Sequence, residues 1–117
     1  MIQVFGIPNC GSVKKARTWL EERGAAYDFV DFKKSPPSAQ HITNWLHHIG
    51  RERLINRKGT SWRGLSDADK ALADTDAGAQ TLIAANASLI KRPLIAWPDG
   101  ALTVGFDETV FAEHWKG

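Results

Sequence analysis

The spacing of apolar residues predicts a strand, a helix and a second strand at the start of the chain. Residues 2–7 form a short apolar run, which is typical of a buried strand. Beyond Cys10, apolar residues recur with the period of a helix, and Gly24 supplies a natural end for it. Residues 26–32 alternate and predict the second strand. A strand, a helix and a strand in one short stretch form a βαβ unit, so the two strands should run parallel.

The middle of the chain is predicted to be mostly helical. Residues 33–38 form a proline-containing break from which the next helix starts, and Gly50 ends that helix. Its apolar positions follow the spacing i, i+3, i+4 and i+7, at Ile42, Trp45, Leu46 and Ile49. The basic stretch 51–63 is predicted to have a loop at its centre, over residues 59–61.

Three further helices and a hairpin are predicted in the remaining chain. Ser66 and Asp76 are predicted to cap the first two of these helices. Residues 94–97 and 101–104 are short strands joined by a Pro-Asp-Gly turn, which predicts an antiparallel hairpin. Asp107 then caps a last helix, whose predicted apolar side carries Val110, Phe111 and Trp115.

The order of these elements predicts the fold class. A parallel pair followed by an antiparallel hairpin predicts a four-stranded mixed sheet with helices packed against it. With a cysteine at the first strand-to-helix turn, this α/β layout is that of the thioredoxin-like fold. We therefore expect one domain over residues 1–117, with a helical insertion at about residues 36–88 between the second and third strands.

Composition narrows the class of protein. The 117 residues suffice for one core, and 43% hydrophobic with 24% charged residues is typical of a soluble globular domain. The net charge of +2 is too small to require nucleic acid as a partner. No charged leader or long apolar stretch follows Met1, so we expect no signal peptide, no membrane span and a cytoplasmic protein. His41 and His114 lack the spacing of metal ligands, and we expect no metal site.

Cys10 is the candidate for chemistry, because it lies where a strand passes into a helix. Pro8, Asn9 and Gly11 mark the turn there. The free N–H groups and the positive dipole end of a helix N-terminus favour a thiolate, and Lys14 adds positive charge one turn further on. A buried structural cysteine is the alternative, although the polar flanks favour a functional one. The chain has no second cysteine, so an internal disulfide is excluded.

Four stretches of the chain match one known family. They are Phe-Gly-Ile-x-Asn-Cys at 5–10, Lys-Lys-Ala-Arg-x-Trp-Leu at 14–20, Asn-Arg-Lys-Gly-Thr-Ser-Trp-Arg at 56–63, and Ile-Lys-Arg-Pro-Leu at 90–94. By these stretches the chain resembles the arsenate reductase (ArsC) family, most closely its Spx/YffB-like branch, over essentially its full length. The resemblance implies a thioredoxin-like fold and thiol chemistry at Cys10.

The resemblance also implies roles for individual residues. In the family's arsenate reductases, three arginines hold the oxyanion, and glutathione with glutaredoxin supplies electrons. Arg57 matches the first arginine, with Lys58 or Arg63 in that role if the loop shifts by a residue, and Arg92 matches the second. The resemblance further implies that Pro93 follows a cis peptide bond and faces the cysteine.

Two departures from the family pattern bear on function. The third arginine would fall near residues 104–106, where the chain has none, so a tetrahedral dianion would be poorly neutralised on one side. The regulatory Spx proteins usually carry a Cys-x-x-Cys switch, but Val13 occupies the fourth position here. That switch cannot form, and a resolving thiol must come from another molecule.

The leading hypothesis is a glutathione-dependent monothiol reductase or thiol transferase with Cys10 as its nucleophile. Glutathione would be a co-substrate, no bound cofactor is expected, and glutaredoxin is a candidate partner. The residues predicted to bind the substrate or glutathione are Ser12, Lys14, Arg57, Arg63, Arg92 and Pro93. On the residues alone, Ser12 and Lys14 fit an ordinary helix surface equally well, and Arg57 and Arg63 fit a solvated basic loop.

Two other functions remain open from the sequence. One is arsenate reduction with glutathione and glutaredoxin, in which Lys91 or Arg63 replaces the missing arginine. The other, implied by the resemblance to Spx, is a non-catalytic regulator that binds RNA polymerase through the basic stretch 51–63.

Overall fold

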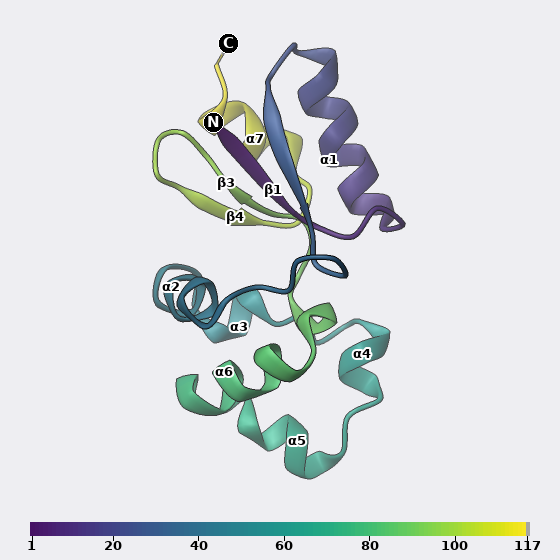
Figure 1. Ribbon diagram of the computed structural model, residues 1–117, viewed down its shortest axis with the longest axis vertical. Helices are drawn as coiled ribbons and strands as arrows, with labels where there is room; N and C mark the ends of the chain where they lie inside the picture. Colours follow the sequence, from purple (N-terminus) through teal and green to yellow (C-terminus); the bar gives the residue numbers. More distant parts are fainter. Residues whose placement is uncertain (117) are drawn as a thin grey trace. The chain divides into compact units, whose positions relative to one another are not determined.

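The computed structural model describes residues 1–116, and the chain divides into two compact units. The first, which we call the sheet unit, holds Met1–Ser35 and the chain from Arg92 onward. The second, the helical unit, holds Pro36–Lys91. Figure 1 shows the strands gathered in the first unit and short helices in the second. In the described part of the chain, no helix is long and apolar enough to cross a membrane.

Within residues 1–116, the sheet unit contains four strands and two helices. They are β1 (Ile2–Gly6), α1 (Gly11–Glu22), β2 (Tyr27–Asp31), β3 (Leu94–Ala96), β4 (Leu102–Val104) and α7 (Glu108–His114). The strand order is β2-β1-β3-β4; β1 and β2 are parallel, whereas β3 runs antiparallel to both β1 and β4. The predicted mixed sheet and hairpin are therefore confirmed, and the fold is thioredoxin-like.

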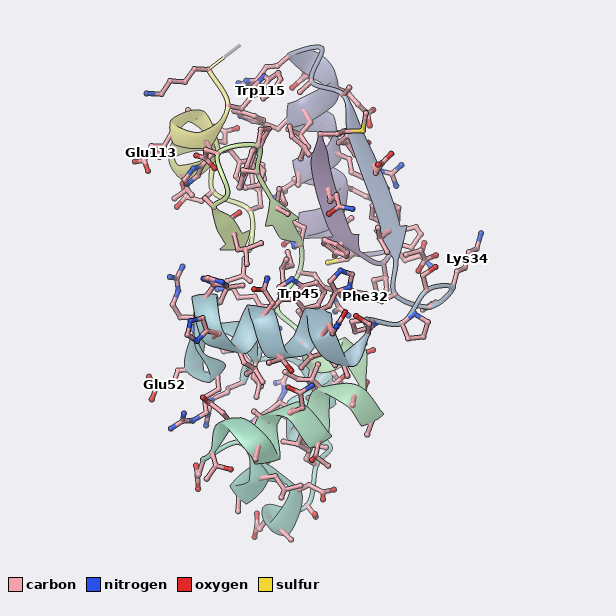
Figure 2. The ribbon with its side chains drawn as sticks, turned by 60° about the vertical axis from the view of Figure 1, so that its left-hand side comes forward. Phe32, Lys34, Trp45, Glu52, Glu113 and Trp115 are labelled. Atoms are coloured by element: carbon pink, nitrogen blue, oxygen red, sulfur yellow. The ribbon has the colours of Figure 1, made fainter. Side chains whose placement is uncertain are left out.

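One face of this sheet packs against α1 and α7. Apolar residues of β1 and β3 meet those of both helices in one core, formed by Ile2, Val4, Ala16, Trp19, Leu20, Ala25, Ile95, Trp97 and Phe111. Phe111 is completely buried, and its ring makes edge contacts with Trp19, Trp97 and Phe106 at centroid distances of 5.4, 5.1 and 5.2 Å. Trp115 follows α7 and packs on the same core (Figure 2).

The helical unit consists of short helices. They are α2 (Ala39–Ile49), α3 (Arg51–Leu54), α4 (Thr60–Arg63), α5 (Asp67–Leu72), α6 (Asp76–Ala85) and the 3-10 turn η1 (Ala87–Leu89). Ser38 caps α2 by accepting a hydrogen bond from the backbone N–H of His41 at 3.1 Å, and Ser66 caps α5 in the same way. An antiparallel bridge between Ile55 and Ile90 ties the chain after α3 to the end of the unit.

Three local predictions were wrong in detail. The predicted loop over residues 59–61 is largely helical, because α4 starts at Thr60 with Gly59 as its N-cap. Thr75, rather than Asp76, caps α6 by accepting a hydrogen bond from Gly78 at 3.0 Å. Asp76 is instead the first residue of α6. Trp115 lies beyond the end of α7 in extended backbone, although its ring still joins the core.

Candidate thiol site

Cys10 occupies the N-cap position of α1, at the end of the loop that follows β1. Its backbone N–H donates a hydrogen bond to the carbonyl of Ile7 at 3.3 Å, and its own carbonyl accepts one from Lys14 at 3.0 Å. The sulfur makes no capping hydrogen bond, and Cys10 is a free, half-buried cysteine. The backbone therefore holds the residue at the helix start while the sulfur stays available for reaction.

The sheet register brings Arg92 and Pro93 to the same edge as this loop. Phe5, near the end of β1, pairs with Leu94 at the start of β3, because the two strands are antiparallel. Arg92 and Pro93 precede Leu94 and so lie at the edge where β1 ends. The peptide bond between them is cis, as the family resemblance implied. Pro93 is buried and Arg92 is half-buried.

Val13 fixes the start of α1 against the end of β1. It is completely buried, and a Cβ atom on Gly6 would lie only 2.7 Å from its Cγ2 atom. Glycine is required at position 6 because the stiff valine side chain fills that space. The residue that excludes a Cys-x-x-Cys switch is thus a packing residue that positions the cysteine three residues before it.

Ser12 and Lys14 are both exposed on the first turns of α1. Neither side chain forms a hydrogen bond or ion pair with another described residue. The guanidinium of Arg92 likewise has no such partner in residues 1–116. The sheet unit thus presents a partly exposed thiol and uncommitted polar and cationic groups near the start of α1 and the adjoining sheet edge.

Arg57 and Arg63 belong to the helical unit and are both exposed. The Arg57 guanidinium lies over the ring of Trp62, 4.8 Å from its centroid. Arg57 lies within a turn shaped by Asn56, whose side-chain oxygen accepts a hydrogen bond from the Lys58 backbone N–H at 3.1 Å. Cys10 thus shares the sheet unit with Ser12, Lys14, Arg92 and Pro93, whereas Arg57 and Arg63 belong to the helical unit. The binding roles of all these candidates stay predictions.

The segment that would carry a third arginine contains a glycine in a backbone conformation that other residues rarely adopt. Gly105 has a φ of +84°, in the left-handed region that favours glycine, and its N–H donates a hydrogen bond to the Pro93 carbonyl at 2.9 Å. Any other side chain at this position would strain the backbone. The segment after β4 therefore shapes the edge next to Pro93 without supplying a cation.

Groups with shifted pKa values lie at the other end of the sheet. A hydrogen bond with His114 lowers the pKa of Asp99, which lies in the hairpin turn. Burial raises the pKa of Tyr27, which pairs with Ile2 at the start of β1, although its hydrogen bond with Arg17 opposes the shift. Within residues 1–116 no three His, Cys, Asp or Glu side chains are grouped as metal ligands would be.

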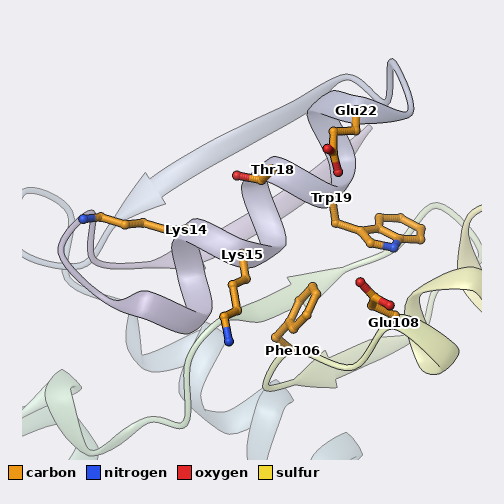
Figure 3. A pocket seen from close by; sticks show the side chains of 7 residues that line it. All are labelled: Lys14, Lys15, Thr18, Trp19, Glu22, Phe106 and Glu108. Carbon is orange, nitrogen blue, oxygen red and sulfur yellow. The ribbon is translucent and has the colours of Figure 1, made fainter.

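Sequence reasoning missed a pocket of about 440 Å³ beside α1. Its lining residues come from α1 and from the chain around the start of α7, namely Lys14, Lys15, Thr18, Trp19, Glu22, Phe106 and Glu108 (Figure 3). Lys15 and Glu22 are two helical turns apart, a spacing that places them on one side of a helix. The spacing of these two residues was the available signal in the sequence. The lining residues near the start of α7 could not be found in this way, because they reach the pocket through packing between elements distant in sequence.

Comparisons with known proteins agree on a family. The model of the ArsC family matches residues 5–114. An uncharacterized protein of Haemophilus influenzae is 35% identical, covering 92% of this chain and 93% of its own length. The global transcriptional regulator Spx of Streptococcus agalactiae is 29% identical, covering 92% of this chain and 78% of its own length.

Solved structures agree with the same family. A protein described as YFFB is 38% identical and superimposes with a TM-score of 0.91 over 97% of this chain and 98% of its own. An arsenate reductase (ArsC) related protein from Brucella melitensis is 37% identical, with a TM-score of 0.74 over 99% of this chain and 95% of its own. The similarity thus extends over the sheet unit and the helical unit alike.

Proposed function

The chain belongs to the ArsC family, and from this premise we propose that it is a monothiol reductase or thiol transferase that uses glutathione as its co-substrate. The observation that carries the proposal is Cys10, the single cysteine, at a helix N-cap with an unengaged sulfur. A helix N-terminus favours the thiolate that such exchange needs. A glutathione-dependent reaction of this kind belongs in the cytoplasm, where thiols are kept reduced.

Two exchange steps complete the reaction on a glutathionylated substrate. The Cys10 thiolate attacks the glutathionyl sulfur, forms a disulfide with it, and releases the substrate as a thiolate that takes up a proton. A second glutathione thiolate then attacks the glutathionyl sulfur on Cys10. This step releases oxidised glutathione and restores the Cys10 thiolate. Two electrons pass from glutathione to the substrate disulfide, and no second protein cysteine is needed.

Arg92 and Lys14 are the proposed partners of the glutathione carboxylates in the sheet unit. Both side chains lack a carboxylate partner among the described residues, so neither must break an existing ion pair to bind. Ser12 is proposed to donate a hydrogen bond to the thiolate. Pro93 is proposed to line the site, and Arg57 and Arg63 to add positive charge from the helical unit.

Turnover of a glutathionylated peptide tests this proposal. Oxidised glutathione release is coupled to NADPH consumption by glutathione reductase, with and without glutaredoxin. We expect turnover that disappears in Cys10→Ser and a KM for glutathione that rises roughly tenfold in Arg92→Ala, as loss of a charge-assisted hydrogen bond implies. Arg23→Ala is the matched control, because it removes a cation at the C-cap of α1, the end of that helix away from Cys10. Equal background rates for wild type and Cys10→Ser would refute the proposal.

Arsenate reduction is a second candidate, favoured by the similarity to the arsenate reductase related protein from Brucella melitensis. The oxyanion would be held by Arg92 and Arg57, with Lys91 or Arg63 on the side that lacks the third arginine. Arsenite formation in the presence of glutathione and glutaredoxin decides between the two substrates.

A regulator that binds RNA polymerase is a third candidate, favoured by the similarity to Spx. The exposed cations of stretch 51–63 would then form the contact surface, since charge complementarity governs such encounters. Co-purification of polymerase subunits, abolished by reversing the charges of Arg57 and Arg63, would support this function over the enzymatic ones.

A further inference from the structure

The base of the pocket beside α1 is apolar and packs against the core of the sheet unit. Trp19 and Phe106 line it, and the ring of each makes an edge contact with Phe111. Phe111 is completely buried in the core of the sheet unit. Because the base packs on the core, the pocket exists without a ligand. Trp19 is only 4% exposed, so the half-buried Phe106 ring supplies most of the aromatic surface that an apolar side chain can contact.

The rim of the same pocket carries two cations and two anions at different ends. Lys14 and Lys15 lie toward the start of α1, whereas Glu22 and Glu108 lie on either side of the Trp19 indole (Figure 3). None of the four side chains forms an ion pair or hydrogen bond with another described residue. All four charges are therefore free to meet charges of a ligand.

The spacing of these charges sets the length of a matching ligand. Lys15 and Glu22 are seven positions apart, which is about 10 Å along a helix axis. An extended polypeptide advances about 3.4 Å per residue, so roughly three positions separate groups that meet the two ends. A segment with charges of one sign would gain an attraction at one end and meet repulsion at the other.

We propose that this pocket binds an extended polypeptide segment with an acidic and a basic side chain three positions apart and apolar side chains between them. The acidic group meets Lys14 and Lys15, and the basic group meets Glu22 and Glu108. The Lys14 N–H donates to the Cys10 carbonyl at 3.0 Å, so the pocket begins one helical turn from the thiol. We therefore assign the segment to the chain flanking the sulfur of a protein substrate, an assignment that rests on the proposed thiol transfer.

Peptide binding to the whole reduced protein tests the pocket without requiring turnover. The probe is acetyl-Asp-Leu-Leu-Lys-amide, and the controls replace both charged residues with aspartate or both with lysine. Backbone amide shifts are followed by NMR. We expect the mixed-charge peptide to bind roughly threefold to tenfold more tightly than either control, as two exposed ion pairs allow, with shifts in α1 and at the start of α7. Equal binding of the three peptides would overturn the proposal.

A change of preference in a variant gives an independent check. In Glu22→Lys with Glu108→Lys, the pocket has only cations on its rim, and the doubly acidic peptide should now bind best. The matched control, Asp28→Lys with Glu113→Lys, changes the protein's charge equally at exposed positions outside the pocket and should keep the original preference. An unchanged preference in the pocket variant, with its circular dichroism intact, would contradict the inference.

Thiol exchange at Cys10 separates failure of this inference from failure of the proposed function. If glutathionylated peptides are turned over but the mixed-charge peptide has no binding advantage, the pocket assignment alone is wrong. If the mixed-charge peptide binds in the pocket while Cys10 performs no exchange, the pocket stands and the assignment of the segment to a thiol substrate is wrong.

Discussion

Phe111 links the core of the sheet unit to the pocket, and replacing it by leucine should destabilise this unit strongly. The ring makes three edge contacts with other aromatic rings, at centroid distances between 5.1 and 5.4 Å. Each such contact contributes about 0.5–1.5 kcal/mol beyond burial of area. Leucine keeps most of the buried apolar volume, a change that by itself costs less than about 1.5 kcal/mol. Because the contacts share one ring and do not add fully, we expect a loss of about 2–4 kcal/mol.

Urea unfolding followed by circular dichroism measures the loss, and hydrogen exchange of the β1 and β3 amides locates it. Val110→Ala is the matched control, because Val110 is a half-buried neighbour on α7 outside the ring cluster. It should lose about 1 kcal/mol or less. The thiol lies near the other end of α1, so folded Phe111→Leu should keep the wild-type rate of glutathionylation. A stability equal to that of Val110→Ala would refute the view that this ring organises the core.

Two further changes test polar contacts of the sheet unit. Thr103→Val removes the hydroxyl oxygen that accepts a hydrogen bond from the buried indole N–H of Trp97 at 2.9 Å. The free energy of unfolding measured in urea should fall by about 1–3 kcal/mol, whereas Thr103→Ser should retain most of the stability. Equal stability of the valine variant and wild type would contradict this. The pKa of Asp99 is lowered in the folded state by its hydrogen bond with His114, so its contribution to stability is present above the ordinary value of 3.8 and is lost as pH falls through the lowered folded value. The melting temperature of Asp99→Asn should therefore lie below that of wild type near pH 6 and approach it only as pH falls below 3.8 and through the lowered folded value. A difference that stays constant down to about pH 2 would count against the pair.

Much of the fold could be predicted because its elements have clear periods. The helical spacing of Val13, Ala16 and Leu20 predicted α1, and the short connection between strands 94–97 and 101–104 predicted the hairpin. A helix of four residues, such as α4, is too short to show a period, so residues 59–61 were interpreted as a loop. Thr75 and Asp76 are adjacent residues that can each cap a helix, and only the backbone geometry distinguishes them.

The candidate site was predictable where it depends on local chain geometry. A cysteine between an apolar run and an amphipathic helix predicted that Cys10 lies where a strand passes into a helix, and the structure places it at the N-cap of α1. The resemblance implied the cis bond before Pro93. The pocket beside α1 was not predictable, because Phe106 and Glu108 reach it only through the packing of α7 on the same core. Long-range packing of this kind leaves no pattern in a single stretch of sequence.

The most direct test of the central claim compares the same thiol in two states of the same chain. Mass spectrometry follows the addition of one glutathionyl group from oxidised glutathione to native protein and to protein unfolded in urea. Both reactions are run at the same pH, and unfolded peptide standards correct for the effect of urea on the exchange rate. Since Cys10 is the single cysteine, every adduct reports on it. We predict that the native protein reacts several-fold faster than the unfolded chain and that added reduced glutathione removes the adduct. A native rate equal to or below that of the unfolded chain would show that the fold does not activate Cys10, and would contradict its role as the nucleophile.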